Sequence, residues 1–196
     1  MKNATLGACA GKLRDGGYTP LSAIAPRGEW LSNSPPHFAA LPDYLTSEHP
    51  AAVACRGAAN LVALVVLPGH DGELAERIRG VLDTHKLTTG PCRIGSDGSE
   101  LYPLKAGVLP PCSWVGLGVL FEHAYRAGPF DEPQPRLIPL DGTWRAGDLL
   151  TVPRAALPAI DSDGIDGIIA ELAALPGKIE TAHRAPPQPT LEAWLG

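Results

Sequence analysis

The stretch Leu61-Val62-Ala63-Leu64-Val65-Val66-Leu67-Pro68-Gly69 decides which fold the sequence predicts. Its first seven residues are all apolar, which suits a buried strand and is too short for a stable core helix. The Pro-Gly pair that follows is a strong turn signal and ends the strand. The sequence therefore predicts a buried strand over residues 61–67.

A helix, a loop and a second strand are predicted directly after this strand. The helix opens at His70-Asp71-Gly72-Glu73, and its predicted buried positions are Leu74, Ile78, Val81, Leu82 and His85. Residues 91–99 read Pro-Cys-Arg-Ile-Gly-Ser-Asp-Gly-Ser, which is typical of a tight loop, and they lead into a second strand near Glu100. A buried strand that delivers histidine and acidic side chains onto a helix N-terminus is a common place for a site.

This unit resembles the N-terminal domain of bifunctional DNA primase–polymerases, in the archaeo-eukaryotic primase superfamily. In that family a hydrophobic strand ends in Asp-x-Asp, and a helix and a Ser-Gly-Gly-x-His loop-strand follow it. Residues 71–78 resemble the start of the family's helix, and residues 93–96 resemble the start of its substrate loop. Gly142-Thr143-Trp144, Leu150-Thr151-Val152-Pro153 and Ala156-Leu157-Pro158-Ala159-Ile160 resemble the closing segment of phage and plasmid members. The resemblance spans roughly residues 18–175 and implies an α+β fold, a mostly antiparallel sheet with helices on one side in a primase–polymerase (RRM-like) core.

The chain departs from the family at the metal-binding motifs. Val66 and Pro68 stand where the family carries its two metal-binding aspartates, and Glu100 stands where it carries the loop histidine. Glu122 is the best match to the third acidic motif. Two-metal phosphoryl transfer needs closely spaced carboxylates, which valine and proline do not supply. The sequence therefore predicts a degenerate active site in a domain related to DNA replication, of phage or plasmid type, that binds nucleic acid, nucleotide or a protein partner.

Two alternative functions fit the same sequence. In the first, the chain is an active DNA primase or nucleotidyltransferase whose acidic ligands have moved to Asp71, Glu73, Glu100 and Glu122. That enzyme would need Mg²⁺ or Mn²⁺, whereas the degenerate domain requires no cofactor. In the second, the chain is a phage structural or assembly protein that reuses the fold.

The predicted helix start carries two candidate metal ligands, His70 and Asp71. The structural alternative is that Asp71 caps the helix and that Glu73 favours the helix dipole, each contributing about 0.5–1 kcal/mol.

The loop after residue 92 carries three candidate nucleotide-binding residues, Arg93, Ser96 and Gly98. Such a loop presents backbone N–H groups to phosphate. The structural alternative is an ordinary hairpin turn, because Ser, Asp and Gly form turns in any fold.

A third candidate group combines Glu100 and Tyr102 with the pair Glu122-His123, which would face one another across adjacent strands. A Glu/His pair binds a cation or moves a proton. The alternative is that these side chains are solvated residues on a sheet face.

The amino-acid composition favours some classes of protein and excludes others. The chain has 196 residues, of which 44% are hydrophobic and 19% charged, so a globular domain is expected. The net charge of −5 does not suit a general nucleic-acid binder, although it leaves room for single-stranded DNA or nucleotide in a local basic groove. No two of the four cysteines have Cys-x-x-Cys spacing, so reduced thiols in a cytoplasmic protein are expected rather than a zinc site. No apolar span reaches 18 residues, so neither a membrane-spanning helix nor a membrane partner is expected.

The chain divides into three predicted parts: an N-terminal arm at 1–17, the primase–polymerase-like domain at 18–177, and a Pro-rich tail at 178–196. The tail ends in Leu191, Trp194 and Leu195, and it either docks on a protein partner or folds back on its own domain. Further predicted elements are strands at 21–25 and 114–123, a short helix at 37–45, a hairpin of strands 136–140 and 148–152, and a helix capped at Asp161.

Overall fold

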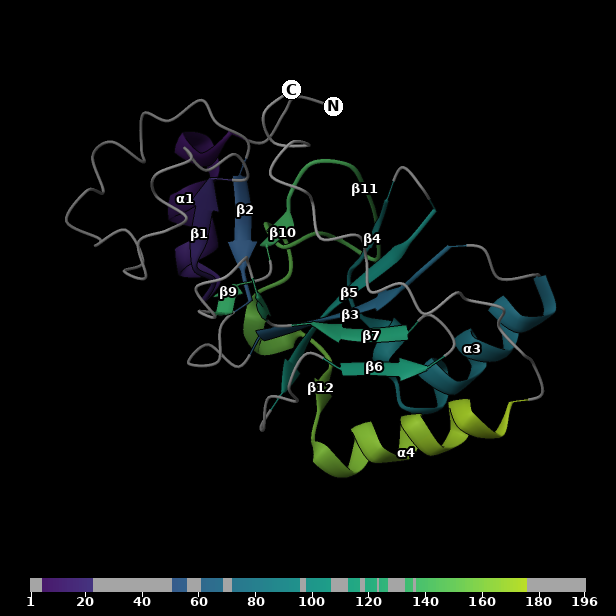
Figure 1. The fold of residues 1–196 in the computed structure, drawn as a ribbon. Coiled ribbons are helices and arrows are strands. Elements are labelled where there is room, and N and C mark those ends of the chain that lie inside the picture. Colours follow the sequence, from purple (N-terminus) through teal and green to yellow (C-terminus); the bar gives the residue numbers. More distant parts are fainter. Residues whose placement is uncertain are drawn as a thin grey trace, which may run out of the picture.

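The computed structural model describes residues 5–22, 51–55, 61–68, 72–95, 98–106, 113–116, 119–122, 124–126, 133–135 and 137–175. These residues form an α+β fold in which α-helices pack against antiparallel sheets (Figure 1). The α+β class predicted from the sequence is therefore confirmed.

Within the described ranges, the largest sheet has seven strands. Six of them follow the order β11-β4-β5-β3-β7-β6 with antiparallel pairing, and β12 pairs with β5 in parallel. The strands are β3 (Leu61–Val66), β4 (Cys92–Ile94), β5 (Glu100–Ala106), β6 (Ser113–Gly116), β7 (Val119–Glu122), β11 (Thr143–Arg145) and β12 (Ala159–Ile160). The strand predicted at 61–67 is β3, and it lies in the middle of this sheet.

Strands β3 and β4 are parallel to each other, because β5 lies between them and pairs antiparallel with both. Helix α3 (Gly72–Thr84) makes the crossover from β3 to β4. The result is a split β-α-β unit, the arrangement of ferredoxin-like sheets. It brings the end of β3, the start of β5 and one face of α3 close together.

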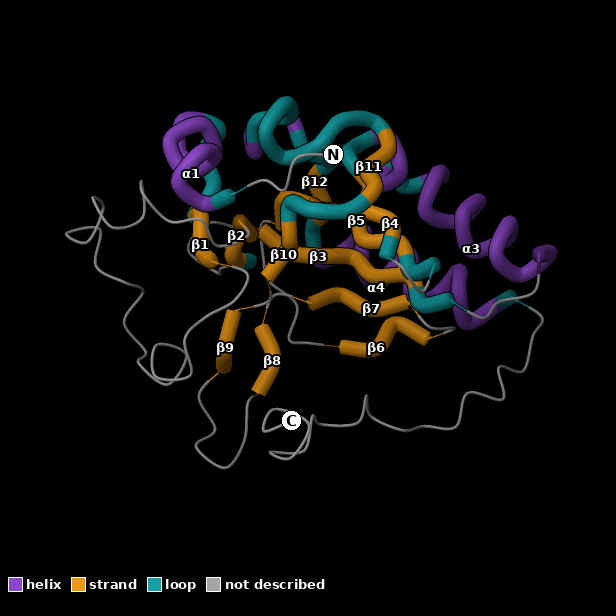
Figure 2. Tube along the Cα trace, turned by 90° about the horizontal axis from the view of Figure 1, so that it is seen from above, coloured by secondary structure: helices purple, strands orange, loops and turns teal. Residues whose placement is uncertain are grey.

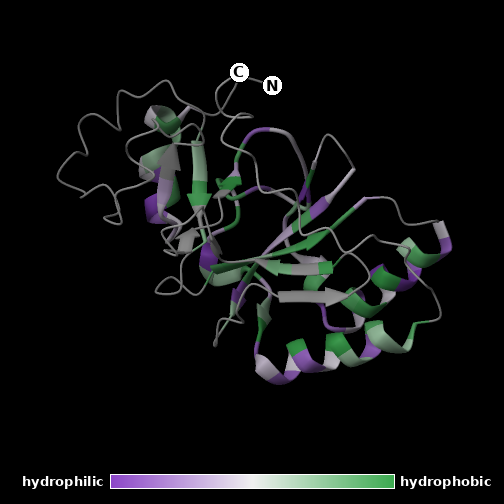
Figure 3. Cartoon of the chain, viewed as in Figure 1, coloured by the Kyte–Doolittle hydropathy of each residue, from purple (hydrophilic) through white to green (hydrophobic). Residues whose placement is uncertain are grey.

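One face of the sheet is covered by α3 and by α4 (Ser162–Ala174), which lie next to each other in Figure 1. Val62 and Leu64 of β3 point into this layer, because alternate residues of a strand share a face. Asp161 caps α4 as predicted, and its side chain accepts a hydrogen bond of 2.8 Å from the backbone N–H of Gly164. Both helices alternate between hydrophobic and hydrophilic residues in Figure 3, as amphipathic helices do. Their buried residues are Ile78, Val81 and Leu82 in α3 and Ile165, Ile168 and Leu172 in α4.

Residues on the opposite face of the sheet share a core with α1 (Leu6–Asp15), with a second sheet of order β1-β2-β10 and with the segment 140–157. Figure 2 shows α1 and the second sheet beside one end of the large sheet. These strands are β1 (Pro20–Ser22), β2 (Ala51–Ala54) and β10 (Leu137–Pro139). Leu61, Ala63 and Val65 of β3 belong to the core on this side. Strand β3 is therefore buried on both faces, which explains why its sequence is continuously apolar rather than alternating.

The layer that contains α1 differs from two predictions. Helices were expected on one side of the sheet, and this holds for α3 and α4 but not for α1. The expected N-terminal arm contains a packed helix, in which Leu6 and Leu13 are fully buried. The helical stripe was hard to recognise because its other two members, Cys9 and Ala10, are small.

Two strand predictions are wrong in detail. Residues 113–116 and 119–122 form two antiparallel strands, β6 and β7, instead of the single strand expected at 114–123. The expected hairpin about Asp141-Gly142 does not form, since β10 pairs with β2 and β11 pairs with β4. Residues 148–152 form a turn rather than a strand, because the Asp148 carboxylate accepts hydrogen bonds from the backbone N–H groups of Leu150 and Thr151 at 3.0 and 2.9 Å.

The remaining elements are short. They are the paired strands β8 (Ala124–Arg126) and β9 (Pro133–Pro135) and the 3₁₀ helices η3 (Leu87–Thr89) and η5 (Arg154–Ala156). The helix predicted at 37–45 and the tail at 178–196 lie outside the described residues. Among the helices that the structure describes, none has the length and apolar character needed to cross a bilayer.

Candidate functional site

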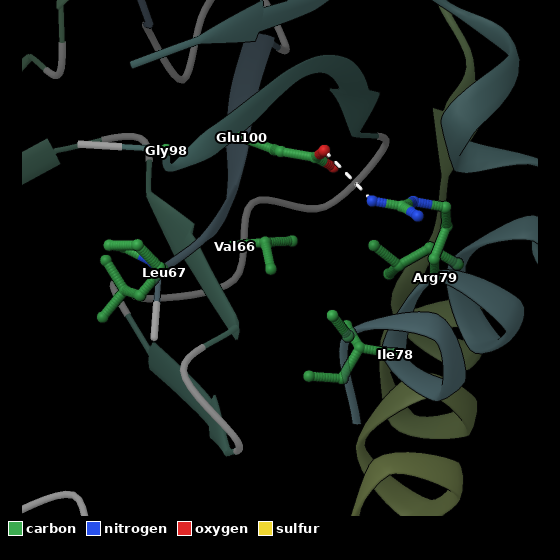
Figure 4. A pocket seen from close by; sticks show the side chains of 9 residues that line it. Val66, Leu67, Ile78, Arg79, Gly98 and Glu100 are labelled. Atoms are coloured by element: carbon green, nitrogen blue, oxygen red, sulfur yellow. Dashed lines mark hydrogen bonds and ion pairs between the residues drawn. The ribbon is translucent and has the colours of Figure 1, made fainter. Parts of the chain in front are cut away.

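A pocket of about 190 Å³ opens where β3 ends, between the sheet and α3 (Figure 4). Strand β3 stops here because Pro68 cannot continue the ladder of hydrogen bonds. Gly98 forms part of the wall, and its φ of +85° is a conformation that favours glycine. The pocket is lined by Val66, Leu67, Pro68, Ala75, Ile78, Arg79, Leu82, Gly98 and Glu100.

The positions that the resemblance matches to the family's metal-binding and loop motifs meet at this pocket. Val66 lies directly opposite Glu100 in the pairing of β3 with β5. Pro68 lines the same pocket, and its Cβ is 3.9 Å from the point that a Cβ on Gly98 would occupy. Two segments that are distant in sequence therefore place Val66, Pro68 and Glu100 around one space.

Glu100 is the centre of the polar contacts at the pocket. Its Oε1 accepts hydrogen bonds from Nη2 of Arg145 at 2.5 Å and from Nη2 of Arg79 at 3.3 Å. Its Oε2 accepts a hydrogen bond from the hydroxyl of Tyr102. Figure 4 shows Arg79 extending from α3 toward Glu100, with Val66 and Ile78 beside them. Both oxygens of the carboxylate are thus occupied by donors from three elements.

The pKa of Glu100 reflects two opposing effects. Burial alone would raise it, but the hydrogen bond from Tyr102 and the guanidinium groups of Arg145 and Arg79 outweigh burial and hold the pKa of Glu100 below its ordinary value. Burial, followed by the hydrogen bond to Glu100, raises the pKa of Tyr102, so the phenol stays protonated and donates. The contact with Cys92 Sγ, at 3.5 Å, raises the pKa of Arg145 together with the charge of Glu100. Glu100 is therefore a carboxylate at neutral pH.

This arrangement has the chemistry of an anion held between cations. A divalent metal would need carboxylate oxygens that point into open space, whereas both oxygens of Glu100 are already hydrogen-bonded. Within the part of the chain that the structure describes, no three His, Cys, Asp or Glu side chains lie together in a way that could hold a metal ion.

Of the other predicted acidic residues, Glu73 does not join Glu100. Glu73 lies in the first turn of α3, where its side chain is 75% exposed and forms an ion pair with Arg77. Glu122 is the register partner of Ala63, three positions along β3 from the partner of Glu100. His70, Asp71 and the Glu122 side chain lie outside the described residues, so their metal-binding and catalytic roles remain predictions.

The predicted nucleotide-binding residues occupy different places. Gly98 lines the pocket, and its N–H closes the loop by donating to the carbonyl of Gly95 at 3.0 Å. Arg93 lies on β4 and is held by the 141–142 turn, since its Nε donates to the Asp141 carbonyl at 2.9 Å. Ser96 lies outside the described residues.

Arg79 and Arg145 are the site residues that sequence reasoning missed. Arg79 directly follows Ile78, a buried residue of α3, and so reads as an ordinary charge on an amphipathic helix. Arg145 directly follows Trp144 in a segment that the resemblance covers, yet nothing in the sequence connects it to Glu100. Only the pairing of β11 with β4, which is next to β5, brings the two together.

Comparisons of the chain with protein-family models, with curated proteins and with solved structures find no match.

Proposed function

We propose that this chain is a catalytically degenerate primase–polymerase-like domain of phage or plasmid type, which binds nucleotide or single-stranded nucleic acid without extending a primer. The observation that carries the proposal is the pocket at the end of β3. The positions matched to the two metal-binding aspartates line it as Val66 and Pro68. The position matched to the loop histidine lines it as Glu100, whose carboxylate forms ion pairs with Arg79 and Arg145.

The order of the elements supports the fold part of the proposal. A hydrophobic strand, a helix and a loop-strand follow one another in the resembling family, and β3, α3 and the β4–β5 hairpin follow one another here. We therefore propose that β3, α3, β4, β5 and β7 are the primase–polymerase core. Cys9 and Cys92 are free thiols buried in the described part, which fits a cytoplasmic location as a further part of the proposal.

The loss of catalysis follows from the chemistry of phosphoryl transfer. In a two-metal site, the metal ions clamp the attacking and leaving oxygens, and carboxylates hold the metals about 3.5–4 Å apart. Val66 and Pro68 offer no ligand atoms, and Glu100 is already engaged by Arg79, Arg145 and Tyr102. A pocket with an apolar wall and a polar rim still suits a bound ligand, because apolar lining with a few oriented polar groups is the usual composition of a binding site.

The test is a binding measurement on the full chain. We expect a fluorescently labelled single-stranded oligodeoxynucleotide, or dATP, to bind without added metal, read by fluorescence anisotropy and calorimetry. The matched variant is Val66→Trp, which fills the pocket without adding charge and should weaken binding, with the melting temperature as a check on folding. Absence of binding by both ligands would refute the proposal and favour the alternative of a structural protein.

A further inference from the structure

We infer that Arg79 and Arg145 together receive a phosphate group of the ligand, with the ligand's uncharged part seated on the apolar wall of the pocket. The inference rests on the proposed function and names the residues and the ligand chemistry of the same site. Neither arginine was among the residues that the sequence indicated.

The two guanidinium groups converge from different elements on one atom. Arg79 reaches Oε1 of Glu100 from α3, and Arg145 reaches it from β11. Two positive charges therefore face one negative charge, and the cluster keeps a net charge of about +1 at the edge of the pocket. A protein with an overall charge of −5 thus has a local cationic site.

The two arginine side chains are more exposed to solvent than the side chain of Glu100. The Glu100 side chain is 17% exposed, whereas the side chains of Arg79 and Arg145 are 47% and 50% exposed. The carboxylate lies beneath the guanidinium groups and fixes their position, while about half of each arginine side chain faces solvent. An approaching anion would therefore meet the guanidinium groups before Glu100.

Both arginines also have hydrogen-bond donors that no described residue uses. A guanidinium carries five N–H groups in a planar fork. Within the described part of the chain, Arg79 uses one nitrogen, toward Glu100, and Arg145 uses one, toward Glu100 and Cys92 Sγ. The other N–H groups have no partner among the described residues. Arginine forks favour phosphate, because two parallel N–H bonds match two phosphate oxygens.

The volume of the pocket limits how much of a ligand it can enclose. Pockets that enclose a whole small molecule measure about 300–1,000 Å³. The pocket here measures about 190 Å³, so it holds only part of a nucleotide. Apolar side chains form most of its wall and suit a flat, uncharged group such as a base. The phosphates would then lie outside the pocket, beside Arg79 and Arg145.

The experiment uses calorimetry on the full chain with three probes: dATP, deoxyadenosine and inorganic tripolyphosphate. The variants are Arg79→Gln and Arg145→Gln, with Arg79→Lys as a conservative partner and Arg77→Gln as the matched control. Arg77 lies on the same helix and pairs with Glu73, and it does not line the pocket. Melting curves show whether each variant folds.

We expect dATP to bind more tightly than deoxyadenosine. Each glutamine variant should lower the affinity for dATP by about tenfold or more. The affinity of Arg79→Lys for dATP should lie between those of Arg79→Gln and the wild type, because lysine keeps the positive charge and lacks the planar guanidinium. Arg77→Gln should bind as the wild type does. If dATP binds equally well to the wild type and to folded Arg79→Gln and Arg145→Gln, the inference is wrong while the proposed function stands. If tripolyphosphate binds in an arginine-dependent way and dATP binds no better, the anion site stands and the proposed function fails. Absence of binding by all three probes overturns both.

Discussion

At the scale of single residues, Glu100 determines the chemistry of the site. Its side chain is 17% exposed, yet it remains charged because Tyr102, Arg145 and Arg79 supply donors to its oxygens. Burial without such partners would raise the pKa of the carboxyl. The same residue that the sequence suggested as a metal ligand is therefore a structural anion that orients two arginines.

This role predicts a pH-dependent loss of stability in Glu100→Gln. The folded state holds the pKa of Glu100 below its unfolded value, so the carboxylate stabilises the fold above the unfolded pKa and loses this contribution as the pH falls through the folded pKa. We expect Glu100→Gln to unfold about 1–3 kcal/mol more easily than the wild type at about pH 7. The difference should shrink as the pH falls below the ordinary pKa of a glutamate side chain, because the wild-type carboxyl then becomes protonated.

Urea unfolding of both proteins across this pH range measures the difference. Glu73→Gln is the control, because Glu73 is 75% exposed and its pair with Arg77 spans one turn of a surface helix. A difference between Glu100→Gln and the wild type that stays constant from neutral to acidic pH would contradict the assigned role.

At the scale of elements, β3 joins the two cores of the molecule. Leu61, Ala63 and Val65 pack on the side of α1, whereas Val62 and Leu64 pack on the side of α3 and α4. Strand β3 thus contributes to both hydrophobic cores, so a disruptive substitution in β3 should destabilise the whole fold.

We predict that Leu64→Asp prevents folding. Leu64 is fully buried, and an unpaired carboxylate in such a place costs several kcal/mol, which is comparable to the total stability of a domain. The matched control is Leu64→Val, which keeps an apolar side chain and should cost about 1–2 kcal/mol. Circular dichroism melting curves check both variants. A cooperative transition of Leu64→Asp near the wild-type temperature would show that the side chain is not in the core.

Helix α1 provides a second prediction at this scale. Leu13 is fully buried among residues of the second sheet, so Leu13→Ala should destabilise the protein by about 2–5 kcal/mol. The neighbouring Lys12→Ala is the control and should change stability by less than about 0.5 kcal/mol, since Lys12 is exposed. Chemical denaturation compares the two. Equal stabilities would mean that this segment is an arm after all.

The sequence predicted the elements with strong local signals and missed the contacts between distant segments. The apolar run at 61–67 and the capped helix after Asp161 were predicted correctly, because hydrophobic length and capping are local properties. The predicted hairpin about Asp141-Gly142 was wrong, because a turn of this sequence can join two adjacent strands or two strands of different sheets. The arginines of the site could not be predicted for the same reason, since their link to Glu100 depends on strand order.

At the scale of the whole molecule, we propose a primase–polymerase-like domain whose pocket lacks the family's metal ligands and keeps a place for a ligand. The net charge of −5 is no obstacle, because binding depends on the local charge of the Arg79, Arg145 and Glu100 cluster rather than on the total. Binding without catalysis is the central claim.

The most direct test is a primer synthesis and extension assay on the same full-length sample used for binding. Labelled deoxynucleotides, a single-stranded template with and without a primer, and Mg²⁺ or Mn²⁺ would be supplied, with an active polymerase as the positive control. We expect nucleotide and oligonucleotide binding and no incorporation above the protein-free background. Incorporation that depends on the metal and is abolished by Asp71→Ala would contradict the account and favour an active enzyme with relocated acidic ligands.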